Sequence, residues 1–262
     1  MLREAFQYLS TPCEPYARRL GYLGEIIGIG GRYSRHQVLW DEHLQHTRGV
    51  IRDAVSQCQR HRKAVVLGSG MLLDIPLEFL SDTFEKVVLV DVLHLRGSRR
   101  QWHHLNNLEF VCDDISGVAR ALHDAIPTSQ EQLPIPQSCA DLIDHDTDLL
   151  ISANLLSQLP VVPCDYLQRH AGFDPALLHD WSQTIIHHHL ELLANARCTT
   201  CLVTDIRHDY LDRAGKVLHQ EDMLCGLQLP QSGHCWQWPL APFGEQSNDY
   251  QVTATVCGLV MR

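Results

Sequence analysis

Two glycines beside an apolar run carry the first chemical signal in the sequence. Gly68, Ser69 and Gly70 follow the run 64–67 and precede a helix-like stretch. Glycine lets the backbone turn tightly and lets a ligand approach the peptide groups without a side chain in between, next to the N–H groups of a helix N-terminus. The arrangement predicts a site for a nucleotide-like ligand, although an ordinary strand-to-helix turn would contain the same glycines.

Acidic residues follow at the ends of the next two apolar runs. Asp91 comes 21 residues after the second glycine, and a carboxylate at that point can accept hydrogen bonds from both hydroxyls of a ribose. Asp113 and Asp114 end the following run, where an acidic side chain could meet an adenine amino group while Ile115 packs on the ring. Each acid taken singly is explained as well by a helix cap or a solvated charge. Together, at successive strand ends, they predict a nucleoside site.

The elements that would position these residues alternate along the chain. Short apolar runs typical of strands buried on both faces lie at 64–67, 86–90, 108–111, 149–152 and 200–204. Helix-like segments separate them at 73–81, 97–105, 117–125 and 175–196. This alternation predicts an α/β, doubly wound fold with a mostly parallel sheet. The last two strands of a seven-stranded sheet, 235–238 and 251–260, have no helix between them and predict a C-terminal antiparallel hairpin. Prolines in 127–147 and 160–173 predict loops on the rim.

The N-terminal part of the chain lacks strand-like alternation. Apolar residues recur at helical intervals over 38–55, which predicts an amphipathic helix. Glycines and arginines over 28–35 predict a flexible loop ahead of it, because glycine weakens regular structure. We therefore expect an N-terminal helical cap over 1–62 and a Rossmann-like domain over 63–262.

Composition excludes several classes of function. The chain has 262 residues, with 21 Lys and Arg against 31 Asp and Glu, a formal net charge of −10. Residues 1–63 hold ten of these basic residues and six of the acidic ones; the acidic remainder would repel a phosphate backbone, which argues against nucleic acid as the main partner. No apolar run approaches the roughly 20 residues that span a bilayer, and the opening residues, which carry Arg3 and Glu4, lead us to expect no secretory leader. Ten cysteines spread over a chain of this length predict reduced thiols in a cytoplasmic protein. Monomer and homo-oligomer both stay open.

At this point the sequence resembles the class I S-adenosylmethionine-dependent methyltransferases, over roughly residues 60–262. The glycine turn is similar to the family's glycine-rich motif, the second strand end to its ribose-binding acid, and the third to its adenine-contacting pair. Segment 148–160 is similar to its fourth strand and following turn, and the family fold also ends with an antiparallel strand inserted beside the fifth. The resemblance implies S-adenosylmethionine as cofactor. The positions it assigns to cofactor binding are Gly68, Ser69, Gly70, Asp91, Val92, Asp114, Ile115, Ser152, Ala153 and Asn154.

The sequence departs from the family pattern at two positions. Leu72 stands where the family usually has a third glycine, and Val66 stands where many members have an acid. The basic N-terminal part offers a compensation, because family members often carry a helical cap there. Arg32 or Arg35 could form a charge-assisted pair with the carboxylate of the cofactor, or remain solvated.

The implied reaction makes few chemical demands on the protein. Methyl transfer from a sulfonium is an in-line displacement with a good leaving group, so the protein mainly has to align the acceptor and exclude water. A hydroxyl or protonated amine as acceptor would also need a base near the ends of the fourth and fifth strands. His208 and Asp209 are expected there, on a loop after the fifth strand, and His36 of the cap is a second choice. The expected acceptor is a small molecule.

Two other functions stay open. A nicotinamide-dependent oxidoreductase would use the same glycines and acid, but Leu73 occupies the third glycine-like position and no Tyr-x-x-x-Lys pair occurs. A non-catalytic methyltransferase-like protein, which binds or serves as a scaffold, would fit the two departures from the family pattern. No metal site is expected, because Cys198 and Cys201 have zinc-like spacing but no second pair, and they begin a buried strand.

Overall fold

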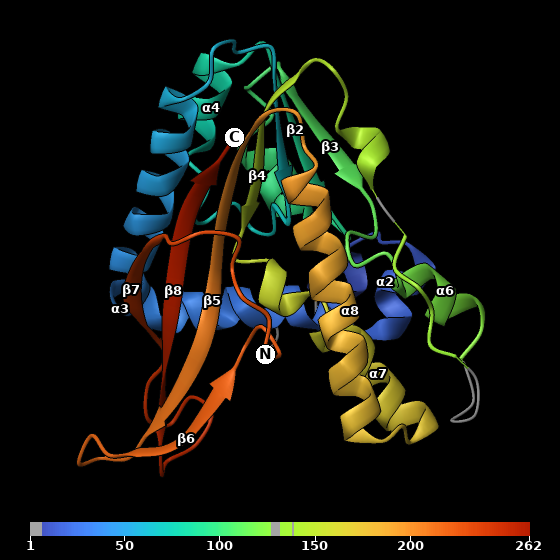
Figure 1. Cartoon of the computed structure of the whole chain (residues 1–262), viewed down its shortest axis with the longest axis vertical. Coiled ribbons are helices and arrows are strands. Elements are labelled where there is room, and N and C mark those ends of the chain that lie inside the picture. Colours follow the sequence, from blue (N-terminus) through green and yellow to red (C-terminus); the bar gives the residue numbers. More distant parts are fainter. Residues whose placement is uncertain (1–6, 127–131, 138) are drawn as a thin grey trace.

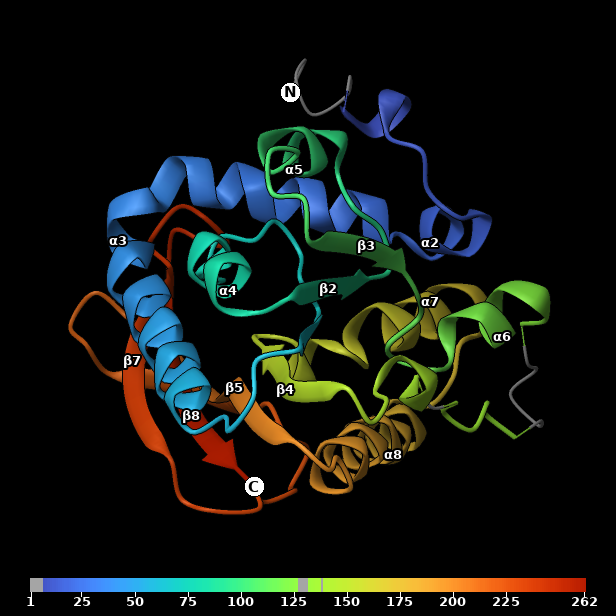
Figure 2. The same cartoon turned by 90° about the horizontal axis from the view of Figure 1, so that it is seen from above.

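The computed structural model describes residues 7–126, 132–137 and 139–262. Within these residues the chain forms one eight-stranded sheet with helices on both faces (Figures 1 and 2). The sheet follows the order β3-β2-β1-β4-β5-β8-β7, and β6 pairs with β5 outside that path. The strands are β1 Lys63–Leu67, β2 Lys86–Asp91, β3 Leu108–Cys112, β4 Thr147–Ala153, β5 Thr199–Leu211, β6 Val217–Asp222, β7 His234–Ala241 and β8 Gln251–Met261.

The strand directions confirm the predicted fold class. Strands β1 to β5 run parallel, and β8 lies antiparallel between β5 and β7. Strand β6 was not predicted: all six of its residues are exposed, so it has no buried face to produce an alternating pattern. Strand β5 continues well past the predicted end at residue 204, because its second half pairs with β6 and β8.

Helices cover both faces of the sheet. They are α2 Pro15–Leu20, α3 Tyr22–Ser56, α4 Leu77–Thr83, α5 Arg96–Gln101, α6 Ala119–Asp124, α7 Val161–Ala171 and α8 Pro175–Ala194, with the short turns η1 Ala140–Leu142 and η2 Leu156–Gln158. Side chains alternate along β1: Val65 and Leu67 share a core with α7 and α8, whereas Ala64 and Val66 share one with α3 and α4. The two cores make the fold doubly wound, as predicted. No helix in the described parts of the chain has the length and apolarity needed to cross a bilayer.

Helix α3 corrects the predicted loop at 28–35. The helix runs through all of these residues and bends at His36 (φ −127°, ψ 28°) (Figure 2). A glycine costs an α-helix about 1 kcal/mol relative to alanine, but Leu23, Ile26 and Ile27 are buried against the rest of the protein. Tertiary burial therefore outweighs the local propensity.

The predicted rim loops have different outcomes. Helix α7 occupies most of 160–173, so that prediction is wrong: Tyr166 and Leu167 are buried, and the two prolines lie at the N-cap and in the first turn, where a helix loses no hydrogen bond to a missing N–H. The predicted loop over 127–147 falls partly outside the described residues. In its described part, η1 precedes β4.

A disulfide joins the two strands of the C-terminal hairpin. Cys235 of β7 and Cys257 of β8 are directly opposite each other and are bonded. The expectation of reduced thiols is therefore wrong for this pair. Directly opposite residues of an antiparallel pair have their Cβ atoms about 4.5–5.5 Å apart, so the bond depends on the register of the hairpin, which the spacing of the cysteines does not reveal.

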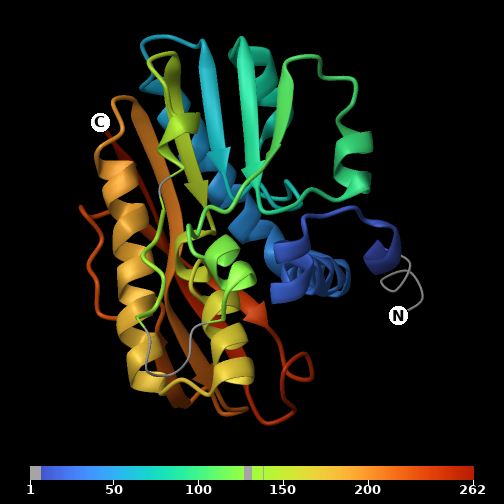
Figure 3. The ribbon, with the colours of Figure 1, turned by 90° about the vertical axis from the view of Figure 1, so that its right-hand side faces the viewer.

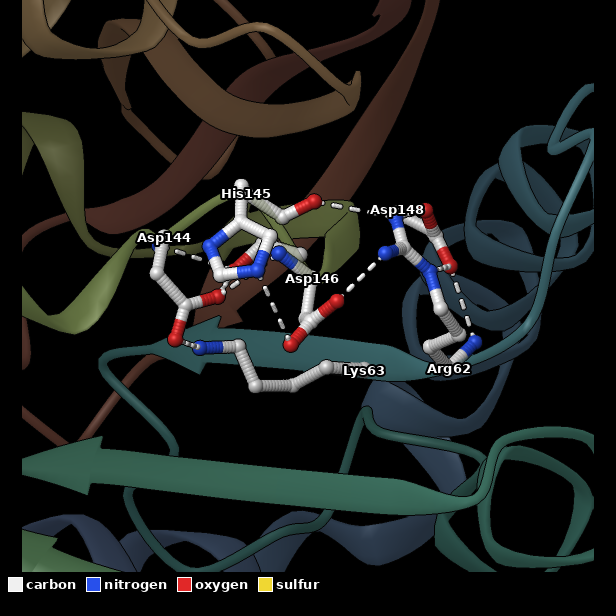
Figure 4. Close-up of polar contacts among 7 residues, drawn as sticks. Arg62, Lys63, Asp144, His145, Asp146 and Asp148 are labelled. Carbon is white, nitrogen blue, oxygen red and sulfur yellow. Dashed lines mark hydrogen bonds and ion pairs between the residues drawn. The ribbon is translucent and has the colours of Figure 1, made fainter.

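A polar network joins the beginnings of β1 and β4 at the amino edge of the sheet (Figure 4). The backbone N–H of Arg62 donates to Asp148 Oδ2 over 2.8 Å, and its guanidinium group contacts Asp146 and Asp148. Lys63 Nζ lies 2.8 Å from Asp144 Oδ2, and this bond lowers the pKa of Asp144 to about 2. The network sets the two central strands side by side, with Leu67 opposite Ser152 at their carboxyl ends.

Candidate active site at the carboxyl edge of the sheet

A cavity of about 210 Å³ lies outside the carboxyl ends of the central strands. Its wall has three parts: the turns that follow the strands, the first half of α3, and the segment from η2 into α7. Figures 1 and 3 show the first half of α3 crossing below these strand ends. The strand order reverses between β1 and β4, and ligands of open α/β sheets bind at this switch point. A larger hollow, of about 480 Å³, lies near the start of β4 and the end of α8, at the opposite edge.

The glycine turn after β1 forms one side of the cavity. Gly68 and Gly70 have positive φ angles of 72° and 51°, and a Cβ added to Gly68 would lie 2.9 Å from Leu155 Cβ. The hydroxyl of Ser69 is buried without a partner among the described residues, and its side chain does not line the cavity. Leu72, at the position where the family usually has glycine, has the left-handed φ of 61° that glycine would adopt freely. The turn thus keeps glycine-like geometry despite the departure in sequence.

Asp91 closes the turn against the end of β2. Its Oδ2 accepts a 2.6 Å hydrogen bond from the N–H of Gly70, which links the two predicted motifs directly. Burial raises the pKa of Asp91 to about 6, and the N–H groups of Gly70, Leu93 and Val92 oppose this rise. Val92 lines the cavity beside it. These three N–H groups leave part of the carboxylate's capacity of about four acceptor positions for a ligand.

Asp114 lies in the wall, but its carboxylate is fully engaged. Oδ1 accepts from Ser116 Oγ and the N–H of Gly117, and Oδ2 accepts from the N–H groups of Ala119 and Arg120. These four bonds use its acceptor positions. The predicted contact with an adenine amino group therefore has no free acceptor, and the side chain instead organises the start of α6. Ile115 lines the cavity as predicted.

The three residues predicted to face a ligand at the end of β4 separate. The side chain of Ser152 is buried on the face of the sheet that packs against α8, where its hydroxyl lies 2.9 Å from His189 Nε2. Ala153 is packed in the core shared with α3. Both follow the strand alternation, which points neighbouring side chains to opposite faces. Only Asn154 lines the cavity, with φ 53° and its amide donating to Asp74 Oδ2 over 2.6 Å.

Two parts of the wall were missed by sequence reasoning. From α3 come Tyr22, Glu25, Ile26 and Ile29, and from η2 and α7 come Gln158, Leu159, Val161 and Val162. Burial raises the pKa of Tyr22, and the nearby charges of Asp114 and Asp91 add to the rise. The spacing of Tyr22, Ile26 and Ile29, at i, i+4 and i+7, was the available signal for a helical wall.

The basic residues of α3 have a partner within the protein. Glu245, in the connector between β7 and β8, forms ion pairs with Arg32 and Arg35 and lies 2.7 Å from His36 Nε2. The contacts with Arg35, first, and with His36 lower the pKa of Glu245 to about 2. None of the three basic residues lines the cavity. The predicted pairing of an arginine with a cofactor carboxylate, and the role of His36 as a base, therefore gain no support from the geometry.

His208 and Asp209 lie within β5 rather than on a loop. His208 is buried and its Nε2 lies 2.6 Å from Asp205 Oδ2, while Asp209 accepts from Arg207 and from Gln220. Neither lines the cavity. Adjacent strand residues point to opposite faces, so the two side chains cannot act together on one ligand.

Comparisons with known proteins give likenesses at low identity. No protein-family model matches the chain, and no curated protein matches it. Among solved structures, a complex of DhpI with S-adenosylhomocysteine is 12% identical, over 87% of this chain and 91% of that one, with a TM-score of 0.37. The N-methyltransferase NodS of Bradyrhizobium japonicum is 13% identical, over 81% and 85%, with a TM-score of 0.36. The 1,6-didemethyltoxoflavin-N1-methyltransferase of Burkholderia thailandensis is 10% identical, over 89% and 88%, with a TM-score of 0.37. The chemistry of the cavity has to be judged from its own residues.

Proposed function

We propose that the protein is an S-adenosylmethionine-dependent methyltransferase that acts on a small molecule. One observation carries the proposal: Gly70 donates a hydrogen bond to Asp91, and both line a cavity at the switch point of the sheet. A glycine turn with positive φ angles admits a ligand close to its peptide groups, and the carboxylate beside it can accept from a ribose. The antiparallel strand inserted beside β5 also agrees with the class I methyltransferase fold.

The residues of the cavity suit the parts of this cofactor. Asp91 would hold the ribose hydroxyls, while Ile115 and Val92 would contact the faces of the adenine ring. Gly68 and Gly70 would lie along the amino-acid part of the cofactor, and Asn154 would lie near its methyl group. Asp114 would shape the wall without contacting the amino group of the base. When bound, the cofactor supplies an electrophilic methyl group on a sulfonium.

The protein's share in the reaction is alignment and exclusion of water. Ile26 and Ile29 of α3, with Val161 and Val162 of α7, give the cavity an apolar part of its wall. Such a wall fits a small acceptor that displaces water as it enters. His208, Asp209 and His36 are not assigned as bases in this proposal, because each is paired elsewhere.

Titration calorimetry with three ligands tests the proposal. S-adenosylmethionine and S-adenosylhomocysteine should bind, and NAD should not. Asp91→Ala should weaken binding of both adenosyl ligands by at least about 100-fold, because two hydrogen bonds to a charged group are lost at about 1.5–3 kcal/mol each. Asp113→Ala is the matched control, since Asp113 directly follows the neighbouring strand β3 but does not line the cavity.

Two outcomes would contradict the proposal. Binding of NAD alone would favour an oxidoreductase, and binding of none of the three would favour a scaffold. Transfer of a labelled methyl group from S-adenosylmethionine to members of a small-molecule library would then separate an enzyme from a protein that only binds the cofactor.

A further inference from the structure

One acidic side chain in the wall of the cavity has no partner among the residues that the structure describes. The acidic residues of the wall are Glu25, Asp91 and Asp114, and no described lysine or arginine lines it. Asp91 receives the N–H of Gly70, and Asp114 is saturated by its four donors. The carboxylate of Glu25, by contrast, makes no ion pair or side-chain hydrogen bond with any described residue. A bound ligand can therefore use this carboxylate without breaking an existing contact.

The course of α3 places Glu25 along the cavity. Tyr22 marks one end, because the charges of Asp114 and Asp91 act on it. Ile29 marks the other, as the last residue of α3 that lines the cavity, and the next residue, Gly30, lies beside the glycine turn, because a Cβ added there would be 3.0 Å from Met71 Sδ. Glu25 lies between Tyr22 and Ile29, about 4.5 Å along the helix axis from the first and about 6 Å from the second at 1.5 Å per residue. Glu25 therefore lies on α3 between the nucleoside end of the cavity and the glycine turn.

A bound cofactor would present a positive charge along this path. S-adenosylmethionine and S-adenosylhomocysteine both carry an amino-acid end with an ammonium and a carboxylate, and with the ribose at Asp91 this end would lie between the glycine turn and α3. An ammonium has three donors and no acceptor, so a carboxylate is its natural partner. Val66, at the position where many members of the resembled family have an acid, is fully buried in the core and cannot supply one.

We propose that Glu25 binds the ammonium group of the cofactor's amino-acid end. The inference rests on the proposed function and adds a selectivity to it: the site distinguishes adenosyl ligands that carry the amino acid from those that lack it. Glu25 also lies in the first turn of α3, where an acid stabilises a helix by interacting with its macrodipole. A role confined to the helix would not distinguish between ligands, and this difference makes the inference testable.

The test compares Glu25→Gln with wild type by titration calorimetry against three ligands. These are S-adenosylmethionine, S-adenosylhomocysteine and 5′-methylthioadenosine, which has the nucleoside and sulfur but no amino acid. The variant should bind the first two about fivefold more weakly, the size expected for a partly exposed ion pair, and 5′-methylthioadenosine unchanged. Glu42→Gln is the matched control, because Glu42 is an exposed acid on the same helix outside this cavity. It should leave all three affinities unchanged.

Each other outcome has a definite meaning. Unchanged affinity of the variant for all three ligands would overturn the inference and leave the proposed function standing. Equal weakening of all three would also overturn it, because Glu25 would then act on the helix or on the nucleoside end. Weakening for S-adenosylmethionine alone would assign Glu25 to the sulfonium rather than the ammonium, again against the inference. Failure of wild type to bind any adenosyl ligand would refute the proposed function, and the inference with it.

Discussion

Ligand binding should weaken as pH falls from 7 to 5, because of Asp91. Burial raises the pKa of this carboxyl to about 6, against an ordinary value of 3.8. Only the ionised form accepts hydrogen bonds from both ribose hydroxyls. About nine in ten molecules would be ionised at pH 7 and about one in eleven at pH 5, so the apparent Kd should rise roughly tenfold. An unshifted carboxyl would change affinity by less than about 10% over the same interval.

Calorimetric titration of S-adenosylhomocysteine at half-unit steps of pH measures this dependence. Asp91→Asn should bind weakly and with little dependence on pH, which assigns the effect to this residue. Protonation of Asp91 does not weaken binding by unfolding the protein. Because the pKa of Asp91 is raised in the folded state, the folded protein binds this proton more tightly than the unfolded chain between about pH 6 and 3.8. This group therefore adds stability as pH falls. Constant affinity in wild type from pH 7 to 5 would refute the reasoning.

Three further predictions concern packing and charge. Gly68→Ala places a Cβ 2.9 Å from Leu155 at a φ of 72°, so it should cost about 2–4 kcal/mol in urea unfolding and reduce affinity for S-adenosylhomocysteine; an unfolding midpoint like that of wild type would contradict this. Gly258→Ala places a Cβ 2.6 Å from Val50 Cγ2 of α3 and should lower the free energy of unfolding by about 1–3 kcal/mol while the affinity for S-adenosylhomocysteine stays unchanged. A large loss of affinity would contradict this prediction, because it would mean that a shift of α3 at Val50 reaches the cavity. Glu245→Gln should lower stability at pH 7 by no more than about 1 kcal/mol, because its partners are partly exposed. That difference should vanish as pH falls from 4.5 through about 2, the lowered pKa of Glu245; a difference that persists at pH 2 would argue against the ion pairs.

The central strands, and the proximity of the glycine turn to Asp91, could be predicted from the sequence. A strand buried on both faces must be apolar throughout, so β1, β2 and β4 appear as continuous runs. The residues after such runs necessarily lie at the same edge of a parallel sheet. Hydrogen bonding between Gly70 and Asp91 therefore follows from local sequence and strand order together.

Helix propensity gave the wrong result at 28–35, because it scores each glycine without knowing what the helix packs against. The burial of Ile26 and Ile27, which stabilises α3, involves residues far along the chain. The same limit explains why Glu25 and Ile29 were not predicted in the site.

What only the tertiary structure decided is which partner each polar group has. Asp114 looked like a ligand contact, but local N–H groups of α6 use its carboxylate. Arg35 was expected to pair with the carboxylate of a cofactor or to remain solvated, but Glu245, 210 residues away, binds it. Sequence fixes which groups can ionise and where strands end, since these depend on residue type and local burial. The partner of a charge depends instead on distances between segments remote in the chain, which arise only when the sheet and the bent α3 are assembled.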